Sequence, residues 1–221
     1  MYEEWTSALP YVVAWRSVTP LGGAPKRILP DGCLDLIWQD GAVFVAGPDT
    51  TAQVGLPSPG SRHAALRFGA GTGPGVLGVP ASELVDRRVP LDALWPAADV
   101  RAIAEADDPV AALTEAASRR WQGADRAMVA LAGAARAGLP VGSVAERCGL
   151  SSRQLQRRSN TAFGYGPKTL HRILRLQRAV ALARAGRPFA TVSADAGYAD
   201  QAHLAREVRA LAGVPLSALL R

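Results

Sequence analysis

The sequence predicts an α+β protein, with a small antiparallel β domain at the N-terminus followed by an all-α domain. In the first part of the chain, Gly and Pro separate short apolar runs, which is typical of strands joined by turns. From Asp99 onward Gly and Pro become rarer and Ala, Leu and Arg more frequent, which favours helices. A chain of 221 residues is long enough for two such domains, each with its own core.

Four apolar runs in the first part predict strands, and turn residues separate them. The runs are Val12–Val18, Leu34–Trp38, Ala42–Ala46 and Ala64–Phe68. Between the second and third runs, Asp40-Gly41 tolerates positive φ, so we expect a tight hairpin turn there.

A helix is predicted after Asp107-Asp108-Pro109, because proline is favoured in the first helical turn. Its apolar stripe consists of Val110, Leu113, Ala117 and Trp121. We therefore expect three parts: a β-rich sensing or dimerisation domain (1–97), a helical connector (98–124) and a DNA-binding domain (125–221).

Charge divides along the chain. Residues 126–221 contain 15 Lys and Arg but 4 Asp and Glu, a net charge of +11. Residues 1–125 contain 10 Lys and Arg but 15 Asp and Glu, a net charge of −5. Basic segments are often only solvated helix faces, so the asymmetry suggests a polyanion partner only if a binding motif accompanies it.

The first such motif covers residues 139–158. A short helix with Val144, Ala145 and Cys148 on its inner face is expected to end at Gly149. Ser151 is a natural N-cap for a second helix that runs through Leu155. This order of apolar helix, glycine turn, cap and second helix is that of a helix-turn-helix.

The second motif covers residues 189–209 and repeats this order. An apolar helix ends near Gly197, Tyr198 packs inward, and Asp200 is the cap of the following helix. Between the motifs, a long helix is predicted from Pro167 to Ala185. Its buried stripe is expected to contain Leu170, Ile173, Leu174, Leu176, Val180 and Leu182. Such a rod is about 30 Å long, close to the ~34 Å between successive major-groove faces of B-DNA.

The segment from Val141 to the C-terminus resembles the AraC/XylS-type DNA-binding domain. The residues that carry this resemblance are Ser151-x-x-x-Leu155-x-Arg157-Arg158, Gly164-x-x-Pro167, Arg172-x-x-Arg175-Leu176-x-x-Ala179, Gly197-Tyr198-x-Asp200-x-x-His203 and Gly213-Val214-Pro215. Where the family usually has phenylalanine, this chain has Ser159, and Val208 or Leu204 replaces a second one. Either Phe163 fills the first gap or the first unit packs more loosely.

The resemblance implies a bacterial-type transcription regulator with two recognition helices in consecutive major grooves of double-stranded DNA. It places base readers at Arg153, Gln156 and Arg157 in the first unit and at Gln201, His203 and Arg206 in the second. The complete set of predicted DNA-binding residues is Ser152, Arg153, Gln154, Gln156, Arg157, Arg158, Lys168, Gln201, His203, Arg206 and Arg209. Some of them are expected to contact only phosphate, whereas Arg172 and Arg175 suit internal ion pairs or phosphate.

The N-terminal part resembles an uncharacterised small β domain found ahead of AraC-type DNA-binding domains. This resemblance rests on residues 29–37, Gly47-Pro48, Arg67-Phe68, Gly75 and Leu91-x-x-Leu94-Trp95. Pro30-Asp31-Gly32 is first of all a turn, with Asp capping and Gly supplying positive φ. The more specific hypothesis is an effector pocket lined by Trp15, Asp31, Cys33, Asp35, Trp38 and Arg67.

The residue inventory argues against an enzyme. Only one histidine, His63, precedes the helical half, so a histidine metal site cannot be assembled there, and no metal or cofactor is expected. Cys33 and Cys148 lack CxxC spacing, and no run is apolar enough to span a membrane, so we expect a cytoplasmic protein. RNA polymerase, an unknown small-molecule effector and a second copy of the chain are candidate partners. Alternatively, the N-terminal half is only a dimerisation module without a ligand.

Overall fold

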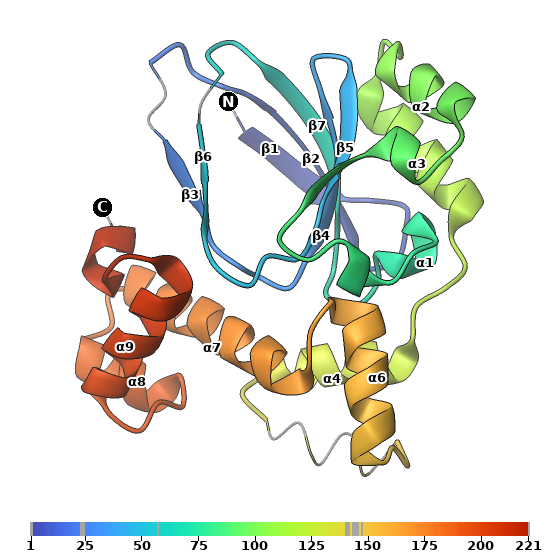
Figure 1. Ribbon diagram of the computed structural model, residues 1–221. Coiled ribbons are helices and arrows are strands. Elements are labelled where there is room, and N and C mark those ends of the chain that lie inside the picture. Colours follow the sequence, from blue (N-terminus) through green and yellow to red (C-terminus); the bar gives the residue numbers. More distant parts are fainter. Residues whose placement is uncertain are drawn as a thin grey trace.

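The computed structural model describes residues 2–22, 25–56, 58–139, 142, 146 and 148–220. It has a β-rich part in the first half of the chain and a helical part in the second (Figure 1). The helical part lies below the sheet in Figure 1, with α6 on one side and α8 and α9 on the other, joined by α7. The predicted α+β class is confirmed.

Two antiparallel sheets form the β-rich part. The large sheet has the strand order β1-β2-β7-β4-β5-β8, and a small sheet pairs β3 with β6. The strands are β1 (Tyr2–Thr6), β2 (Val12–Val18), β3 (Lys26–Ile28), β4 (Leu34–Gln39), β5 (Ala42–Ala46), β6 (Gln53–Gly55), β7 (Arg62–Phe68) and β8 (Arg88–Pro90).

All four predicted strands are present as β2, β4, β5 and β7. The predicted hairpin joins β4 to β5, and both turn residues have positive φ, 46° at Asp40 and 91° at Gly41. The strands β1, β3, β6 and β8 were not predicted, because three of them have only three residues and β1 has two adjacent glutamates.

Helices cover one face of the large sheet. After α1 (Pro74–Leu77) and the short turns η1 (Ala81–Glu83) and η2 (Leu91–Ala93), the chain forms α2 (Ala97–Ala104) and α3 (Pro109–Arg120). Asp108 caps α3, and Leu113 and Ala117 are fully buried, as the sequence predicted. Both helices belong to the apolar core of the sheet, so the predicted connector packs as a layer of the first domain.

The helical part contains two further apolar cores. Its elements are α4 (Arg126–Arg136), α6 (Ser152–Phe163), α7 (Pro167–Arg184), α8 (Phe189–Asp195), α9 (Gln201–Ala212) and η3 (Leu216–Leu220). One core joins α4 and α6 to the first half of α7, and the other joins α8 and α9 to its second half. Within the described residues, no helix is long and apolar enough to cross a membrane.

Candidate nucleic-acid interface

The first candidate reading helix is α6, and its N-terminus is built as the sequence predicted. Ser151 Oγ accepts a hydrogen bond from Gln154 N at 3.3 Å, and Gln154 Oε1 accepts one from Ser151 N at 2.9 Å. This reciprocal capping box satisfies two helix-end donors. The preceding Gly149 has a φ of 62°, the left-handed conformation expected at the turn.

The helix that precedes this turn was predicted to bury Val144, Ala145 and Cys148. Val144 and Ala145 lie outside the described residues. Cys148 is exposed, so its predicted inward position is wrong. It lies in a turn just before α6, so the helical periodicity that was expected to direct its side chain inward does not apply.

The second candidate reading helix is α9, and the predicted turn before it is confirmed. Gly197 has a φ of 83°, Tyr198 is buried, and Asp200 Oδ1 accepts a hydrogen bond from His203 N at 2.6 Å. The two candidate helices thus begin at capped N-termini and lie at opposite ends of α7 (Figure 1).

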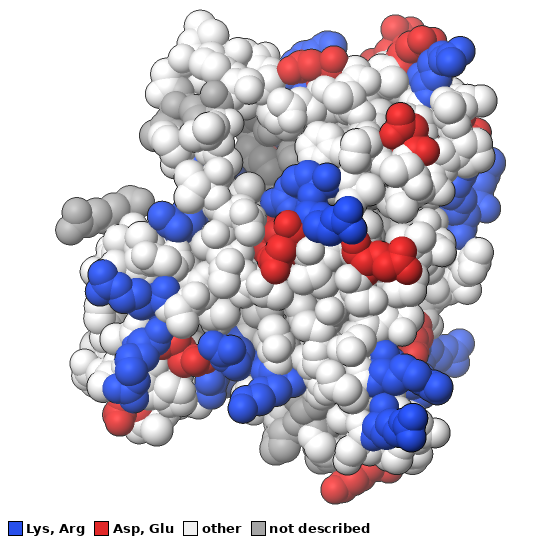
Figure 2. Space-filling model, in the orientation of Figure 1, with Lys and Arg blue, Asp and Glu red and all other residues white. Residues whose placement is uncertain are grey.

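Most of the predicted DNA-binding side chains are exposed. They are Ser152, Arg153, Gln154, Gln156, Arg157, Lys168, Gln201, Arg206 and Arg209. Figure 2 shows basic side chains gathered over the lower left and lower right of the molecule, where these helices lie. Both ends of the helical part therefore present cations to a polyanion.

Some of these side chains already have partners within the protein. Arg158 forms an ion pair with Asp125, the N-cap of α4, from Nε at 2.8 Å to Oδ2. The Gln156 amide donates to Asn160 Oδ1 at 3.1 Å, and His203 Nδ1 accepts from Ala199 N at 3.3 Å. Any contact of Arg158 with DNA would therefore compete with Asp125.

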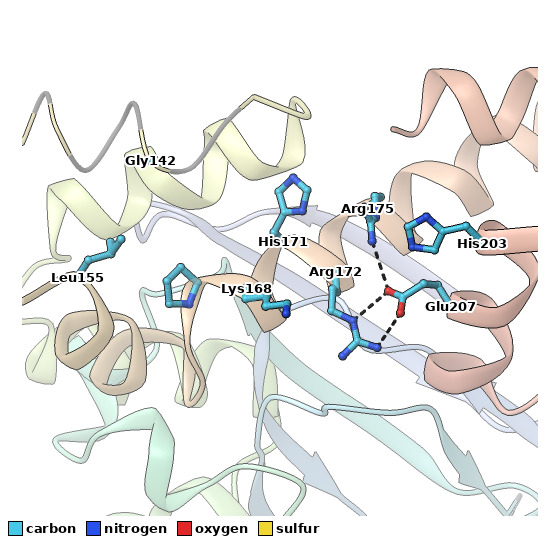
Figure 3. A pocket seen from close by; sticks show the side chains of 9 residues that line it. Gly142, Leu155, Lys168, His171, Arg172, Arg175, His203 and Glu207 are labelled. Atoms are coloured by element: carbon cyan, nitrogen blue, oxygen red, sulfur yellow. Dashed lines mark hydrogen bonds and ion pairs between the residues drawn. The ribbon is translucent and has the colours of Figure 1, made fainter. Parts of the chain in front are cut away.

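A groove of about 730 Å³ runs along α7 between the two candidate helices. Leu155 of α6 lies at one end and His203 and Glu207 of α9 lie at the other (Figure 3). Between them α7 contributes Lys168, His171, Arg172 and Arg175. His171, Glu207 and the α4 N-cap residue Asp125 were not among the residues predicted for the interface, although Glu207 is one of only four acidic residues in the basic segment.

Glu207 joins α9 to α7 through two arginines. Arg172 donates to both carboxylate oxygens, at 2.9 and 3.0 Å, and Arg175 donates at 3.4 Å. The hydrogen bond from Arg172 holds the pKa of the Glu207 carboxyl below its usual value, so Glu207 is ionised at neutral pH. Arg172 and Arg175 are thus internal ion-pair residues, one of the two roles that the sequence suggested.

The remaining basic groups of the groove differ in charge. Burial lowers the pKa of His171, and the positive charge of Arg175 lowers it further, so His171 is mainly neutral at neutral pH. Lys168 is exposed and carries its charge toward the open groove. Among the described residues, the groove therefore offers the Lys168 ammonium group next to a network of two arginines and one glutamate, which carries a net charge of +1.

At the position where the family usually has phenylalanine, the side chain is small and buried. Ser159 is fully buried and donates to the Met128 sulfur at 3.8 Å. Phe163 is 1 % exposed and belongs to the same core as Met128. Filling of the gap at Ser159 by Phe163 stays a prediction, and the Phe163 ring itself lies against Gly71 of the β domain.

The residues proposed for an effector pocket are brought together in part. Arg67 donates to Asp35 from Nε at 3.0 Å and from Nη2 at 3.1 Å, and Trp15 Nε1 donates to the same carboxylate at 3.4 Å. Asp31 Oδ1 accepts from Cys33 N at 2.8 Å, and Gly32 has a φ of 80°, so the predicted turn is confirmed.

Trp38 does not belong to this group, and its inclusion was wrong. It lies three residues after Asp35 on β4, so the alternation of a strand places it on the opposite face. There it is buried in the core under α2, and its Nε1 donates to Ala104 O at 3.0 Å. Burial also raises the pKa of the Cys33 thiol, which leaves it protonated and poorly nucleophilic at neutral pH.

Among the residues that the structure describes, no group of three or more His, Cys, Asp or Glu side chains is arranged to hold a metal ion. Two of the ion pairs that the structure does bring together are Asp35 with Arg67 and Glu207 with Arg172. Their geometry is that of bidentate contacts between planar groups.

Two family models match the chain. Residues 144–221 match a helix-turn-helix domain, and residues 10–90 match a domain of unknown function, DUF6597. A comparison with curated proteins finds no match.

Solved structures of ToxT from Vibrio cholerae are similar to the chain over nearly its full length. An apo ToxT variant has 10% identity and a TM-score of 0.49, and the match covers 97% of this chain and 98% of that one. ToxT with bound unsaturated fatty acid has 10% identity and a TM-score of 0.44, covering 100% of this chain and 97% of that one.

Proposed function

We propose that the chain is a transcription regulator whose C-terminal helix-turn-helix domain is of the AraC type, and that its helices α6 and α9 read consecutive major grooves on one face of a DNA duplex. The observation that carries the proposal is the pair of capped, exposed helices held at the two ends of α7. The 18 residues of α7 make a rod of about 27 Å, comparable with the ~34 Å repeat of the major groove.

Base reading in the first unit is assigned to Arg153, Gln156 and Arg157. Arg153 and Arg157 are one helical turn apart, exposed and close to the capped end, the part of a recognition helix that enters the groove. An arginine can donate two hydrogen bonds to one guanine, which discriminates against another base by about 1–3 kcal/mol. Gln156 uses one of its two amide hydrogens for Asn160, so the other hydrogen and Oε1 remain for a bidentate contact with adenine.

Base reading in the second unit is assigned to Gln201, His203 and Arg206. Gln201 is the first residue of α9 and Arg206 lies near its middle, and both are exposed. His203 uses Nδ1 within the turn, so only its Nε2 remains for a base or a phosphate. Arg209 lies a further turn along α9 and suits phosphate.

Affinity that does not depend on sequence is assigned to phosphate contacts. Lys168 is an ammonium group without the planar fork of arginine, so it suits a phosphate oxygen better than a base edge. Ser152 and Arg158 flank the reading positions of α6 and are assigned the same role. Each phosphate neutralised releases counterions, so binding weakens as salt rises.

A selection of bound duplexes from a random DNA pool by the full-length protein tests this function, at low and at moderate salt. We expect an enriched motif of two short blocks about one helical turn apart. Retention of DNA without any enriched sequence would contradict sequence-specific reading. A single enriched block would contradict the two-groove arrangement while leaving the DNA-binding function in place.

For the N-terminal domain we propose small-molecule sensing at Asp35, Arg67 and Trp15. The observation that favours this is a carboxylate with 17% side-chain exposure that receives donors from two other strands at the face of the sheet opposite α2 and α3. An acidic or cationic ligand could replace one member of the pair. The alternative is a dimerisation module without a ligand.

Thermal unfolding with a panel of small carboxylic acids and amines separates the two roles. A ligand that raises the midpoint of wild type but not of Arg67→Met would support sensing at this site. A dimer in sedimentation, with no compound in the panel shifting the midpoint, would favour the dimerisation role.

A further inference from the structure

The N-terminal domain contacts the C-terminal end of α6. Gly164 ends this helix with a φ of 84°, and a Cβ there would lie 2.3 Å from Val85 Cγ2 and 3.0 Å from Ala81 O. Similarly, a Cβ on Gly71 would lie 2.7 Å from the Phe163 ring. The end of the first reading helix is therefore packed against the β domain without space for a methyl group.

The same domain hydrogen-bonds to the C-terminal end of α9. Arg27 Nη1 of β3 donates to Ala212 O at 2.9 Å, and Ala52 N, just before β6, donates to Leu211 O at 2.7 Å. The last four carbonyls of a helix have no partner within it, so these two donors satisfy two of them at the end of α9. The positive charge of Arg27 also suits the negative end of the helix dipole.

A third contact lies between these two. Gln177 Nε2, near the middle of α7, donates to Pro30 O at 2.6 Å. Figure 1 shows the same arrangement, with β3 and β6 extending from the sheet toward α9 while α6 rises to the region of α1. The three contacts together are called the interdomain contact below.

The interdomain contact adds a second connection between the two helix-turn-helix units. Each unit has its own apolar core, and α7 is the covalent rod that joins them. Because each unit packs on its own half of α7, this one helix alone would otherwise set where the two units lie relative to each other. Because one rigid sheet domain holds the ends of both α6 and α9, the distance and rotation between their free N-terminal ends become fixed.

We propose that Arg27 is a positioning residue that sets the spacing of the two DNA blocks the protein accepts, although it lies in the N-terminal domain and reads no base. The inference rests on the proposed reading of two grooves. The N-terminal domain thereby takes part in DNA specificity, in addition to any sensing role, because Arg27 holds the carbonyl of Ala212 at the end of α9.

A panel of DNA duplexes tests the positioning role of Arg27. In these duplexes the two blocks selected by the wild-type protein are moved apart or together by one or two base pairs. Each base pair changes their separation by about 3.4 Å and their relative rotation by about 35°. Wild type should lose about tenfold or more in affinity at a shift of one base pair, as the contacts of one unit are lost. For Arg27→Met the same shift should cost less than about threefold, with unchanged base preference within each block.

Three further variants sharpen the result. Arg27→Lys retains a donor for Ala212 O and should restore the wild-type spacing preference. Gln177→Leu removes the central hydrogen bond from the side of α7 and should relax spacing in the same direction as Arg27→Met. Arg101→Met, an exposed change on α2, is the matched control and should behave as wild type.

Unchanged spacing preference in both Arg27→Met and Gln177→Leu would overturn the positioning role while leaving the proposed function intact. Wild type that binds all spacings equally would overturn the two-groove reading itself. Uniform weakening of Arg27→Met on every spacing would show a role in stability or general affinity only, and would also overturn the proposal.

Discussion

Arg172 of the linker helix and Glu207 of the second reading helix form a bidentate ion pair, with both bonds between 2.9 and 3.0 Å. Arg175 adds a third bond to the same carboxylate and lies over the ring of Tyr198 at 4.4 Å from its centroid. Beside the apolar core that packs α9 on α7, these ion pairs therefore join the two helices through one of the four acidic residues of a strongly basic segment.

Glu207→Gln is expected to lower the free energy of unfolding by about 1.5–3 kcal/mol at pH 7, the range for hydrogen bonds to charged groups. The pKa of Glu207 is lowered in the folded state, so its contribution is present above the unfolded pKa near 4.5 and is lost as the pH falls through the folded pKa. Urea unfolding of both proteins at pH 7 and in acid measures this. A difference that persists undiminished below the folded pKa would contradict the ionic origin.

Two substitutions of Asp125 are expected to separate its cap from its ion pair. Asp125 Oδ1 accepts from Ala127 N at 3.0 Å, and the carboxylate also pairs with the partly exposed Arg158. Asp125→Asn keeps an acceptor and should cost less than about 1 kcal/mol, as exposed pairs do. Asp125→Ala also loses the cap and should cost about 1 kcal/mol more. Equal losses in urea unfolding would show that the cap contributes nothing.

Gly164→Ala is expected to destabilise the protein more than Gly186→Ala does. Both glycines have positive φ, 84° and 78°, so both substitutions introduce about 1–2 kcal/mol of backbone strain. Only Gly164 faces the β domain, whereas nothing lies within 4 Å of a Cβ on Gly186. The clash should add about 1–3 kcal/mol. Equal unfolding midpoints of the two variants would mean that the domains are not packed together in solution.

Tyr165→Phe is expected to leave stability unchanged or to raise it by up to about 1 kcal/mol. Tyr165 is 7% exposed, and its hydroxyl has no hydrogen-bond partner among the described residues. Burying an unpaired hydroxyl costs free energy that phenylalanine does not incur. Burial also raises the pKa of Tyr165, so the group stays neutral. Thermal unfolding checks this, and a loss above about 1 kcal/mol would indicate a partner for the hydroxyl.

Features determined by a few neighbouring residues were predictable from the sequence. The Asp40-Gly41 hairpin, the Ser151 and Asp200 caps and the turn at Gly197 were of this kind. Trp38 was placed wrongly although the sequence contained the signal, since a separation of three residues from Asp35 reverses the face of a strand.

Features that depend on contacts between distant segments were not predictable. The sequence Lys26-Arg27-Ile28 shows no strand pattern, and it becomes β3 only by pairing with β6. The bond from Arg27 to Ala212 joins residues 185 positions apart, and the pairing of Glu207 with Arg172 depends on how α9 packs on α7. Such partners are selected by the tertiary fold, which local patterns do not encode.

The central claim, that two helices read two separate blocks of one duplex, is tested most directly by repeating the duplex selection with Arg157→Ala and with Arg206→Ala. Each arginine is exposed on a different reading helix. The account predicts that Arg157→Ala loses base preference in one block only and Arg206→Ala in the other, while Lys168→Ala weakens binding to all sequences about equally and reduces its salt dependence. Loss of preference in the same block for both arginine variants, or equal weakening on selected and random duplexes, would contradict it.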